Sequence, residues 1–148
     1  MNDKFIQFNA NPKEKKTTDC VIRALTVALN KSIKDVINGL TDIYLKKGYF
    51  ITDKKCIEQY LKNEGYIKQK QVRYPKDAGK LANKKLTGKE FCVYLNNITT
   101  DISETIIATI GTGHITLFVN KGTKNNKDYK IVDSWDCSTK CVGTWWTR

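Results

Sequence analysis

Helical and strand-like patterns occupy different halves of this 148-residue chain. Before about residue 98, apolar residues recur at the three- and four-residue spacing of amphipathic helices; after about residue 104, β-branched residues gather in short runs. Helices followed by strands, rather than alternating with them, are typical of an α+β fold with an antiparallel sheet. We therefore expect a single domain over residues 1–148, with a helical part at about 17–98 and a sheet part at about 104–147.

Capping residues and turn residues mark the expected elements. Ser32 with Asp35, and Thr87 with Glu90, have the spacing of capping boxes, and Gly48 is placed to end the helix that Ser32 opens. We expect helices over residues 20–30, 33–47, 52–64 and 88–95, and strands over residues 105–110, 113–120, 128–133 and 142–147. Residues 1–16 are expected to be an irregular arm and residues 66–86 a lysine-rich surface loop.

The helix that begins near residue 20 carries a cysteine at its first position. Thr18 and Asp19 precede it and are both good N-cap residues. The helix is then apolar on nearly every side, which predicts burial: Val21, Ile22, Ala24, Leu25, Ala28 and Leu29. A thiol at the positive end of a helix dipole is biased toward the thiolate, so Cys20 is a candidate nucleophile; the alternative is a cysteine that only packs in the core.

The single histidine and a downstream acid supply candidate partners for this thiol. His114 follows Gly113 and opens a predicted strand, and a cysteine nucleophile needs one nearby base. Asp133 ends the next strand and can hold an imidazole in the required tautomer, while Trp135 beside it can exclude water. Asp136 is the rival acceptor, and we expect it instead to cap the turn that follows.

The order Cys20, His114 and then Asp133-Ser134-Trp135 resembles the papain-like cysteine peptidase superfamily. Papain has Asn-Ser-Trp at the last motif, whereas transglutaminases and arylamine N-acetyltransferases have aspartate. The segments Asp-Cys-Val-Ile-Arg-Ala-Leu, Gly-His-Ile-Thr-Leu and Asp-Ser-Trp-Asp-Cys-Ser are more closely similar to small papain-like proteins of bacteriophages and prophages. This resemblance implies a papain-like fold, with N-terminal helices packed on a C-terminal antiparallel sheet, and a Cys-His-Asp triad.

One position departs from the papain pattern. Papain-like peptidases usually have an oxyanion-hole glutamine six residues before the cysteine, but this chain has Glu14 there, whose carboxylate would repel an oxyanion. We expect Asn11 to supply an amide instead, with Asn9 and Gln7 as alternatives. Gly113 and Trp135 are expected to line the substrate cleft.

The basic composition allows a second class of partner. Lysine and arginine number 26 against 15 acidic residues, a formal charge of +11. The excess is almost all lysine and is found along the whole chain, so nucleic-acid binding is possible but not favoured over a peptide or amide substrate. The sequence shows no signal peptide and no membrane-length apolar run, which predicts a cytoplasmic protein, in the host bacterium if a phage encodes it.

Five cysteines with irregular spacing predict free thiols rather than a disulfide framework. A zinc site of Cys92, His114, Cys137 and Cys141 is a weaker alternative, because close ligand pairs are missing. We expect no metal and no cofactor.

The leading functional hypothesis is therefore a cysteine hydrolase, either a thiol protease or an amide hydrolase. Acyl transfer to an amine uses the same triad, and a cell-wall amidase is a further variant. The alternative is a non-enzymatic phage effector of the same fold that binds a host protein or nucleic acid, with lysines and aromatic residues on its surface. Trp145 and Trp146 belong to that surface or, as we favour, to the core.

Overall fold

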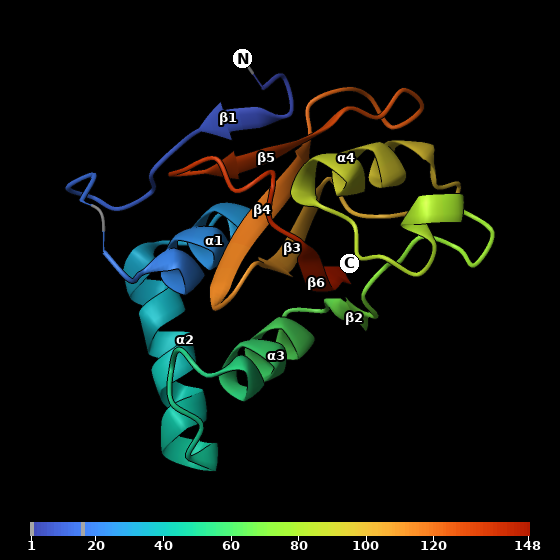
Figure 1. Cartoon of the computed structure of the whole chain (residues 1–148). Helices are drawn as coiled ribbons and strands as arrows, with labels where there is room; N and C mark the ends of the chain where they lie inside the picture. Colours follow the sequence, from blue (N-terminus) through green and yellow to red (C-terminus); the bar gives the residue numbers. More distant parts are fainter. Residues whose placement is uncertain (1, 16) are drawn as a thin grey trace.

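The computed structural model describes residues 2–15 and 17–148, and within them four α-helices pack against a six-stranded mixed sheet (Figure 1). This confirms the predicted α+β class. The helices are α1 (Cys20–Leu29), α2 (Ile33–Lys47), α3 (Lys54–Asn63) and α4 (Gly88–Asn97), and a short 3-10 turn, η1, spans Gly79–Leu81. The strands are β1 (Phe5–Gln7), β2 (Ile67–Gln69), β3 (Thr105–Ile110), β4 (His114–Asn120), β5 (Tyr129–Asp133) and β6 (Val142–Thr147).

The sheet differs from the prediction at its two edges. Its strand order is β1-β5-β4-β3-β6-β2, and β1 pairs with β5 in parallel, so the sheet is mixed rather than antiparallel. β1 lies in the segment expected to be irregular, and β2 lies in the segment expected to be a loop. Both predictions are wrong because a strand of three residues is too short to show a period of two, and only its partner strand stabilises it.

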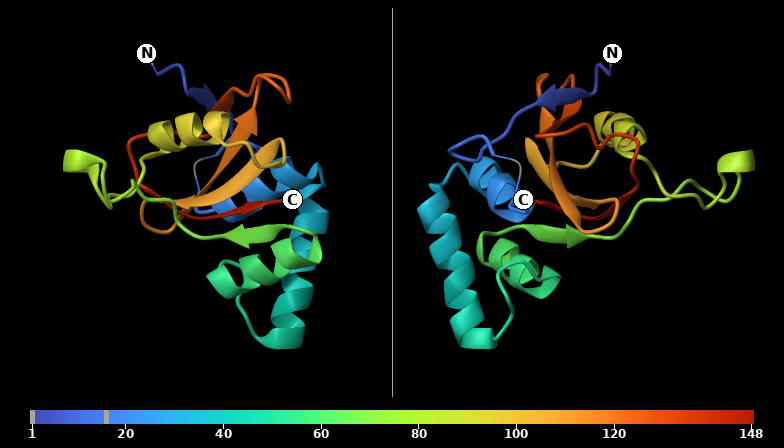
Figure 2. Two further views of the ribbon diagram at one scale, coloured as in Figure 1. Left: turned by 90° about the vertical axis from the view of Figure 1, so that its right-hand side faces the viewer. Right: turned by 60° about the vertical axis from the view of Figure 1, so that its left-hand side comes forward.

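The sheet is buried on both faces. On one face α1, α2 and α3 pack against Ile107, Leu117 and Trp146, and on the other α4 packs against Ile106 and Phe118, as Figure 2 shows. Alternate residues of β3 therefore enter different cores, which explains why its sequence is apolar at nearly every position. Trp145 and Trp146 are both buried, which confirms their assignment to the core.

The capping residues behave as predicted in two of the three helices where we assigned them. Ser32 accepts a hydrogen bond from the Asp35 amide, and Thr87 and Glu90 form a reciprocal capping box. Gly48 ends α2 in the left-handed conformation. Asp19 precedes α1, but its side chain caps no backbone amide. It forms an ion pair with Arg23 instead.

Antiparallel pairing brings the chemically interesting residues to one place. β4 and β5 are adjacent and antiparallel, so His114, the first residue of β4, and Asp133, the last residue of β5, lie toward the same end of this strand pair. α1 packs across β4 and begins at Cys20, near the same end of the strand (Figure 1). The topology thus brings three residues separated by up to 113 positions, from 20 to 133, to the same end of β4.

Candidate active site

Cys20 is the first residue of α1 and is partly exposed. Burial raises the pKa of its thiol, but a hydrogen bond to His114, a second to the Ile115 backbone amide, and the positive charges of His114 and Arg23 outweigh this effect and lower the pKa below its ordinary value. The helix N-terminus acts in the same direction. The lowered pKa favours the thiolate form of Cys20.

The imidazole of His114 is held by a carboxylate. His114 Nε2 lies 2.7 Å from Asp133 Oδ2, and the side chains of the two residues are 12% and 3% exposed. An ionised carboxylate can only accept a hydrogen bond, so Nε2 carries a proton and donates a hydrogen bond to Asp133. Burial lowers the pKa of His114, but the hydrogen bond and charge of Asp133, together with hydrogen bonds to two thiols, raise it to about 11. The raised pKa favours the imidazolium form of the ring.

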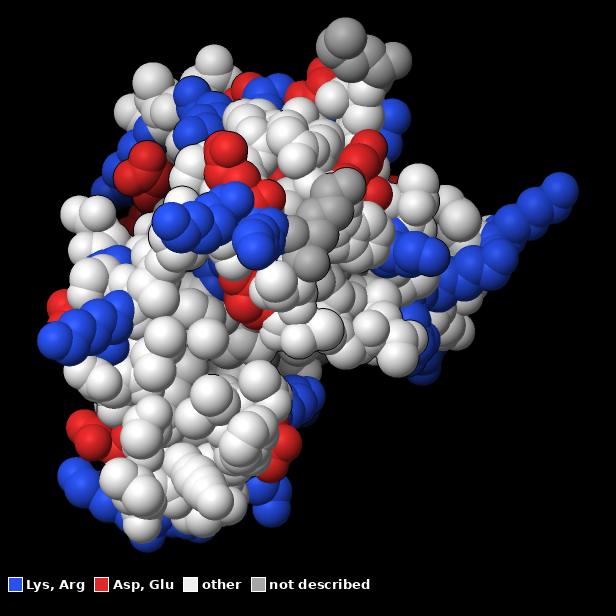
Figure 3. Space-filling model, turned by 90° about the vertical axis from the view of Figure 1, so that its left-hand side faces the viewer, with Lys and Arg blue, Asp and Glu red and all other residues white. Residues whose placement is uncertain are grey.

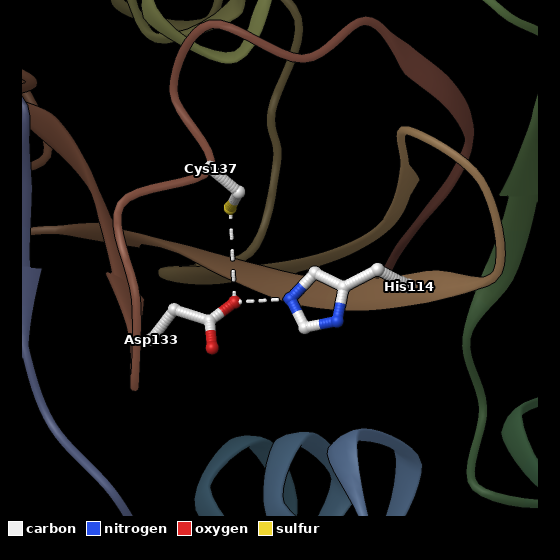
Figure 4. Close-up of side chains that lie close together, drawn as sticks. All are labelled: His114, Asp133 and Cys137. Carbon is white, nitrogen blue, oxygen red and sulfur yellow. Dashed lines mark hydrogen bonds and ion pairs between the residues drawn. The ribbon is translucent and has the colours of Figure 1, made fainter. Parts of the chain in front are cut away.

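The second ring nitrogen, Nδ1, faces the side on which α1 lies (Figure 4). The lowered pKa of Cys20 and the raised pKa of His114 have a common cause, because each group stabilises the charged form of the other. Burial raises the pKa of Asp133, but hydrogen bonding to His114 and to the Ser134 amide lowers it overall. The three pKa shifts therefore favour a thiolate at Cys20, an imidazolium at His114 and a carboxylate at Asp133.

Arg23 is a functional candidate that the sequence analysis missed. Its side chain is 11% exposed; Nε donates to Asp19 Oδ1 at 2.7 Å, and one terminal nitrogen lies 3.6 Å from Asp133 Oδ1. The same nitrogen donates to the Ser134 hydroxyl at 2.8 Å. Arg23 thus ties the helix of the nucleophile to the residue that orients the histidine. The four-residue spacing between Asp19 and Arg23 could have predicted their ion pair from the sequence. No sequence pattern indicates the contact between Arg23 and Asp133.

Cys137 was grouped with His114 only in the alternative zinc set, and its contact with Asp133 was not predicted. It is fully buried, and its Sγ lies 3.7 Å from Asp133 Oδ2, on the side of the carboxylate away from α1 (Figure 4). Cys137, His114 and Asp133 offer three metal-ligating atoms within 4.8 Å of one another. The zinc set considered as a weaker alternative is different: Cys141 is exposed and Cys92 is buried, where burial raises the pKa of its thiol to about 12 and disfavours the thiolate that binds zinc.

Asp136, the rival acceptor, does not contact His114. Its Oδ1 accepts a hydrogen bond from the Ser138 amide at 3.0 Å, and its side chain also meets Asn2. This confirms its predicted role in capping the turn. Between the two acids, the structure places only Asp133 on the imidazole.

The three amide side chains considered for the oxyanion hole are engaged elsewhere. Asn11 Nδ2 donates to Asp19 Oδ2 at 2.9 Å, while its Oδ1 accepts from the amides of two lysines that follow it. Asn9 donates to the Lys15 carbonyl and Gln7 to the Ser134 carbonyl. The geometry gives no support to an oxyanion role for Asn11, because its amide holds Asp19 and does not line the cleft.

An open cleft of about 750 Å³ lies over the thiol. Its walls come from the start of α1, the β3–β4 turn and the segment after β5: Thr17, Thr18, Cys20, Val21, Arg23, Thr52, Thr112, Gly113, His114, Ser134 and Trp135. The structure thus places both Gly113 and Trp135 on the cleft. The Trp135 ring centroid lies 5.0 Å from that of His114, and its side chain remains partly exposed, so it covers the imidazole from solvent on one side.

Gly113 has a positive φ of 68° and nothing within 4 Å of the position of an added Cβ. The turn before His114 therefore favours glycine for its backbone conformation and leaves open space at the cleft. A smaller hollow of about 310 Å³ adjoins the cleft and shares Val21, Thr52, Gly113 and His114 with it.

Comparison with known proteins adds nothing to this geometry. No protein-family model, no curated protein and no solved structure matches the chain. Within residues 2–15 and 17–148, no helix has both the length and the apolar character needed to cross a bilayer.

Proposed function

We propose that this protein is a cysteine hydrolase in which Cys20 is the nucleophile, His114 the proton carrier and Asp133 the residue that orients His114. One observation carries the proposal: a partly exposed thiol at the start of a helix lines the same cleft as an imidazole that lowers the pKa of this thiol and whose Nε2 donates a hydrogen bond to a buried carboxylate. This is the nucleophile, base and orienting group of a covalent-catalysis triad. The resemblance to papain-like peptidases in the same three residues supports it.

The first half of the reaction forms an acyl-enzyme. The Cys20 thiolate attacks the carbonyl carbon of an amide, and the carbonyl oxygen becomes an oxyanion. The tetrahedral intermediate collapses as the C–N bond breaks, and the His114 imidazolium gives its Nδ1 proton to the leaving amine. A thioester and a neutral imidazole remain, with Nε2–H still bound to Asp133.

The second half restores the enzyme. Neutral His114 takes a proton from water, the resulting hydroxide attacks the thioester, and Cys20 leaves as a thiolate beside the re-formed imidazolium. An amine in place of water gives acyl transfer with the same residues. The backbone N–H of Cys20 lies in the first turn of α1, where amides have no partner within the helix, and it is a donor for the oxyanion.

The substrate that fits is a peptide or another amide. The cleft is open and presents hydroxyl, apolar and aromatic side chains around the thiol, which suits an extended chain more than a small buried ligand. We further propose that the protein acts in the cytoplasm, on a host protein if the gene belongs to a phage or prophage, as the resemblance implies.

Competitive labelling with iodoacetamide, read by mass spectrometry on the folded protein, tests the proposal. Cys141 is an internal control, because it is exposed but has no imidazole partner, and Cys56, Cys92 and Cys137 are buried. We expect Cys20 to react faster than Cys141 at neutral pH although it is less exposed, and the excess to vanish in His114→Ala. If Cys141 reacts faster in the wild type, the thiol is not activated and the non-enzymatic effector becomes the better hypothesis.

A further inference from the structure

Residues 70–85 form an arm that projects from the body of the protein and carries η1 at its tip (Figure 2). We call this segment the basic arm. It contains six basic residues, Lys70, Arg73, Lys76, Lys80, Lys84 and Lys85, and one acid, Asp77, a net charge of 6 − 1 = +5. The remaining 132 residues have 26 − 6 = 20 basic and 15 − 1 = 14 acidic residues, or +6. Nearly half of the excess charge therefore lies in about a tenth of the chain.

The cations of the basic arm are accessible to a ligand, although Arg73 also donates to the Asn83 carbonyl at 3.0 Å. All six of these side chains are exposed, and none forms an ion pair with an acid in the described part of the chain. Elsewhere the chain neutralises several of its basic groups: Lys31 pairs with Glu64, and Lys68 pairs with Glu58. Figure 3 shows the difference, with blue side chains and no red along the part that extends to the right, and mixed colours over the body.

The basic arm is an ordered element rather than a loose tail. Two antiparallel segments meet at Arg73 and Lys85, where the Tyr74 amide donates to the Lys84 carbonyl and the Asn83 amide donates back to Tyr74. Its base is tied to the sheet, because the Trp145 indole donates to the Lys70 carbonyl at 3.0 Å. Tyr74 also bonds to Glu90 in the capping box of α4. The charges are held in place before any ligand arrives, which reduces the entropy lost on binding.

From this charge, exposure and order we infer that the basic arm binds the phosphate backbone of double-stranded nucleic acid without sequence preference. Five of its six cations are lysines, which act as point charges on phosphates, whereas arginine is the usual bidentate reader of bases. The large apolar side chain that the arm exposes is Leu81, and the arm presents no exposed aromatic ring on which unpaired bases can stack. These features favour a duplex over a single strand. The inference does not depend on the activity of Cys20.

The salt dependence of duplex binding tests the inference. We expect the wild type to bind a fluorescent 20-base-pair DNA duplex, with log Kd rising linearly with log salt at a slope near 0.9 for each phosphate contacted, about 5 if all six cations take part. That slope corresponds to a loss of about a thousandfold in affinity between 50 and 200 mM salt. A slope below about 1 would show that the six cations do not act together, and would overturn the inference.

Two charge-matched triple variants make the test specific to the basic arm. Lys76→Glu with Lys80→Glu and Lys84→Glu changes the arm, whereas Lys34→Glu with Lys46→Glu and Lys47→Glu makes the same change in net charge on the exposed side of α2. We expect the arm variant to lose at least tenfold in affinity at 50 mM salt and about 2.7 in slope, and the α2 variant to stay within about threefold of the wild type. Equal losses in the two variants would overturn the inference, since net charge alone would then explain binding.

Polyglutamate is the competitor that separates the two kinds of acidic partner. Duplex that is displaced only by a large excess of polyglutamate supports a nucleic-acid site. Tighter binding of polyglutamate than of duplex, lost in the arm variant, would overturn the assignment in favour of an acidic protein. Circular dichroism of both variants confirms that they fold, which the exposure of all six substituted lysines leads us to expect.

Discussion

The candidate active site and the basic arm use charge in opposite ways. In the site Asp19, Arg23, His114 and Asp133 are largely buried, and each lies within hydrogen-bonding or ion-pairing distance of another. In the arm six cations are exposed, and none is paired with an acid in the described residues. The charged groups of the site are paired with one another, whereas those of the basic arm face solvent.

The difference shows where a charge affects chemistry and where it affects only association. A buried charge interacts strongly with its neighbours and shifts their pKa values, so removing one member changes the others. An exposed charge is screened by water and salt, and acts mainly on ligands of opposite sign. Substitutions in the site should therefore have large effects that depend on one another, whereas substitutions in the arm should leave the site unchanged.

The largest effect is expected from removal of the nucleophile. Cys20→Ala should abolish covalent labelling at this position and reduce turnover of any amide substrate by about 10⁴-fold or more, because no other residue can form the acyl-enzyme. Mass spectrometry of the labelled protein and a peptide-hydrolysis assay measure the two quantities. Residual turnover close to that of the wild type would mean that the reaction does not pass through Cys20.

His114→Ala should lower the labelling rate of Cys20 by about 10² to 10⁴-fold at neutral pH. In the wild type the pKa of Cys20 is lowered, so the thiolate persists at pH values below the ordinary thiol range. Without the imidazolium, burial dominates and the pKa rises, so the thiolate forms only at higher pH. The labelling rate measured from pH 5 to 10 should thus shift its midpoint upward; an unchanged midpoint would contradict the pairing of the two residues.

Asp133→Ala and Asp133→Asn should differ. Alanine leaves the imidazolium and Arg23 buried without their shared partner, at a cost of about 3 to 5 kcal/mol in the free energy of unfolding. In the wild type the Ser134 amide donates to Asp133 Oδ1 at 2.6 Å. Asparagine keeps an acceptor for His114 Nε2, but its amide nitrogen takes the place of Oδ1, so two N–H donors face each other. We expect it to cost about 1 to 3 kcal/mol and to retain more activity than alanine. Asp136→Ala is the control and should leave the labelling rate nearly unchanged.

The stability contributed by Asp133 also has a defined pH dependence. Its pKa is lowered in the folded protein, so the ionised carboxylate contributes fully above the ordinary carboxyl pKa, and the contribution is lost as the pH falls through the folded value. The difference in urea-unfolding free energy between the wild type and Asp133→Asn should therefore shrink in acid. A difference that is constant from pH 7 to pH 3 would contradict this assignment.

Arg23→Ala should cost about 3 kcal/mol in the free energy of unfolding, because it removes the buried cation that bridges Asp19 and Asp133. Lys31→Ala, which breaks the more exposed pair with Glu64, is the matched control and should cost no more than about 1 kcal/mol. Urea titration measures both. Labelling of Cys20 should also slow in Arg23→Ala, since Arg23 helps to lower the pKa of the thiol. Equal costs in the two variants would mean that burial does not distinguish the two pairs.

The smallest effect is expected from the arm variant of Lys76, Lys80 and Lys84. Its unfolding free energy should change by no more than about 0.5 kcal/mol for each substitution, as for other exposed positions. Its rate of Cys20 labelling should equal that of the wild type, because screened charges on the arm do not reach the thiol. A changed labelling rate would show that the two regions are coupled.

Local patterns were enough to predict much of this protein. Helical periodicity, the N-cap at Ser32 and the capping box at Thr87 depend on residues a few positions apart, so the sequence displays them directly. The candidate triad was also predicted from local patterns. Cys20 follows two N-cap residues, His114 begins a predicted strand, and Asp133 ends the next strand. The geometry then placed Asp133 on the imidazole, which is the contact that we expected.

Contacts between distant segments could be decided only by the tertiary structure. β1 and β2 are three-residue strands whose hydrogen bonds are satisfied by β5 and β6, and a pattern that short has no detectable period. The same holds for the contacts of Arg23 and Cys137 with Asp133, which depend on how α1 and the segment after β5 are brought together.

The sequence by itself determined the four helices and strands β3 to β6, because helix capping and strand propensity act over a few neighbouring residues. It also contained the six basic residues of the arm, although a charge counted over the whole chain did not distinguish them. The tertiary structure decided which charges are buried with partners and which stand unpaired on a projecting arm. That distinction depends on contacts across the fold, and it separates the residues assigned to chemistry from those assigned to binding.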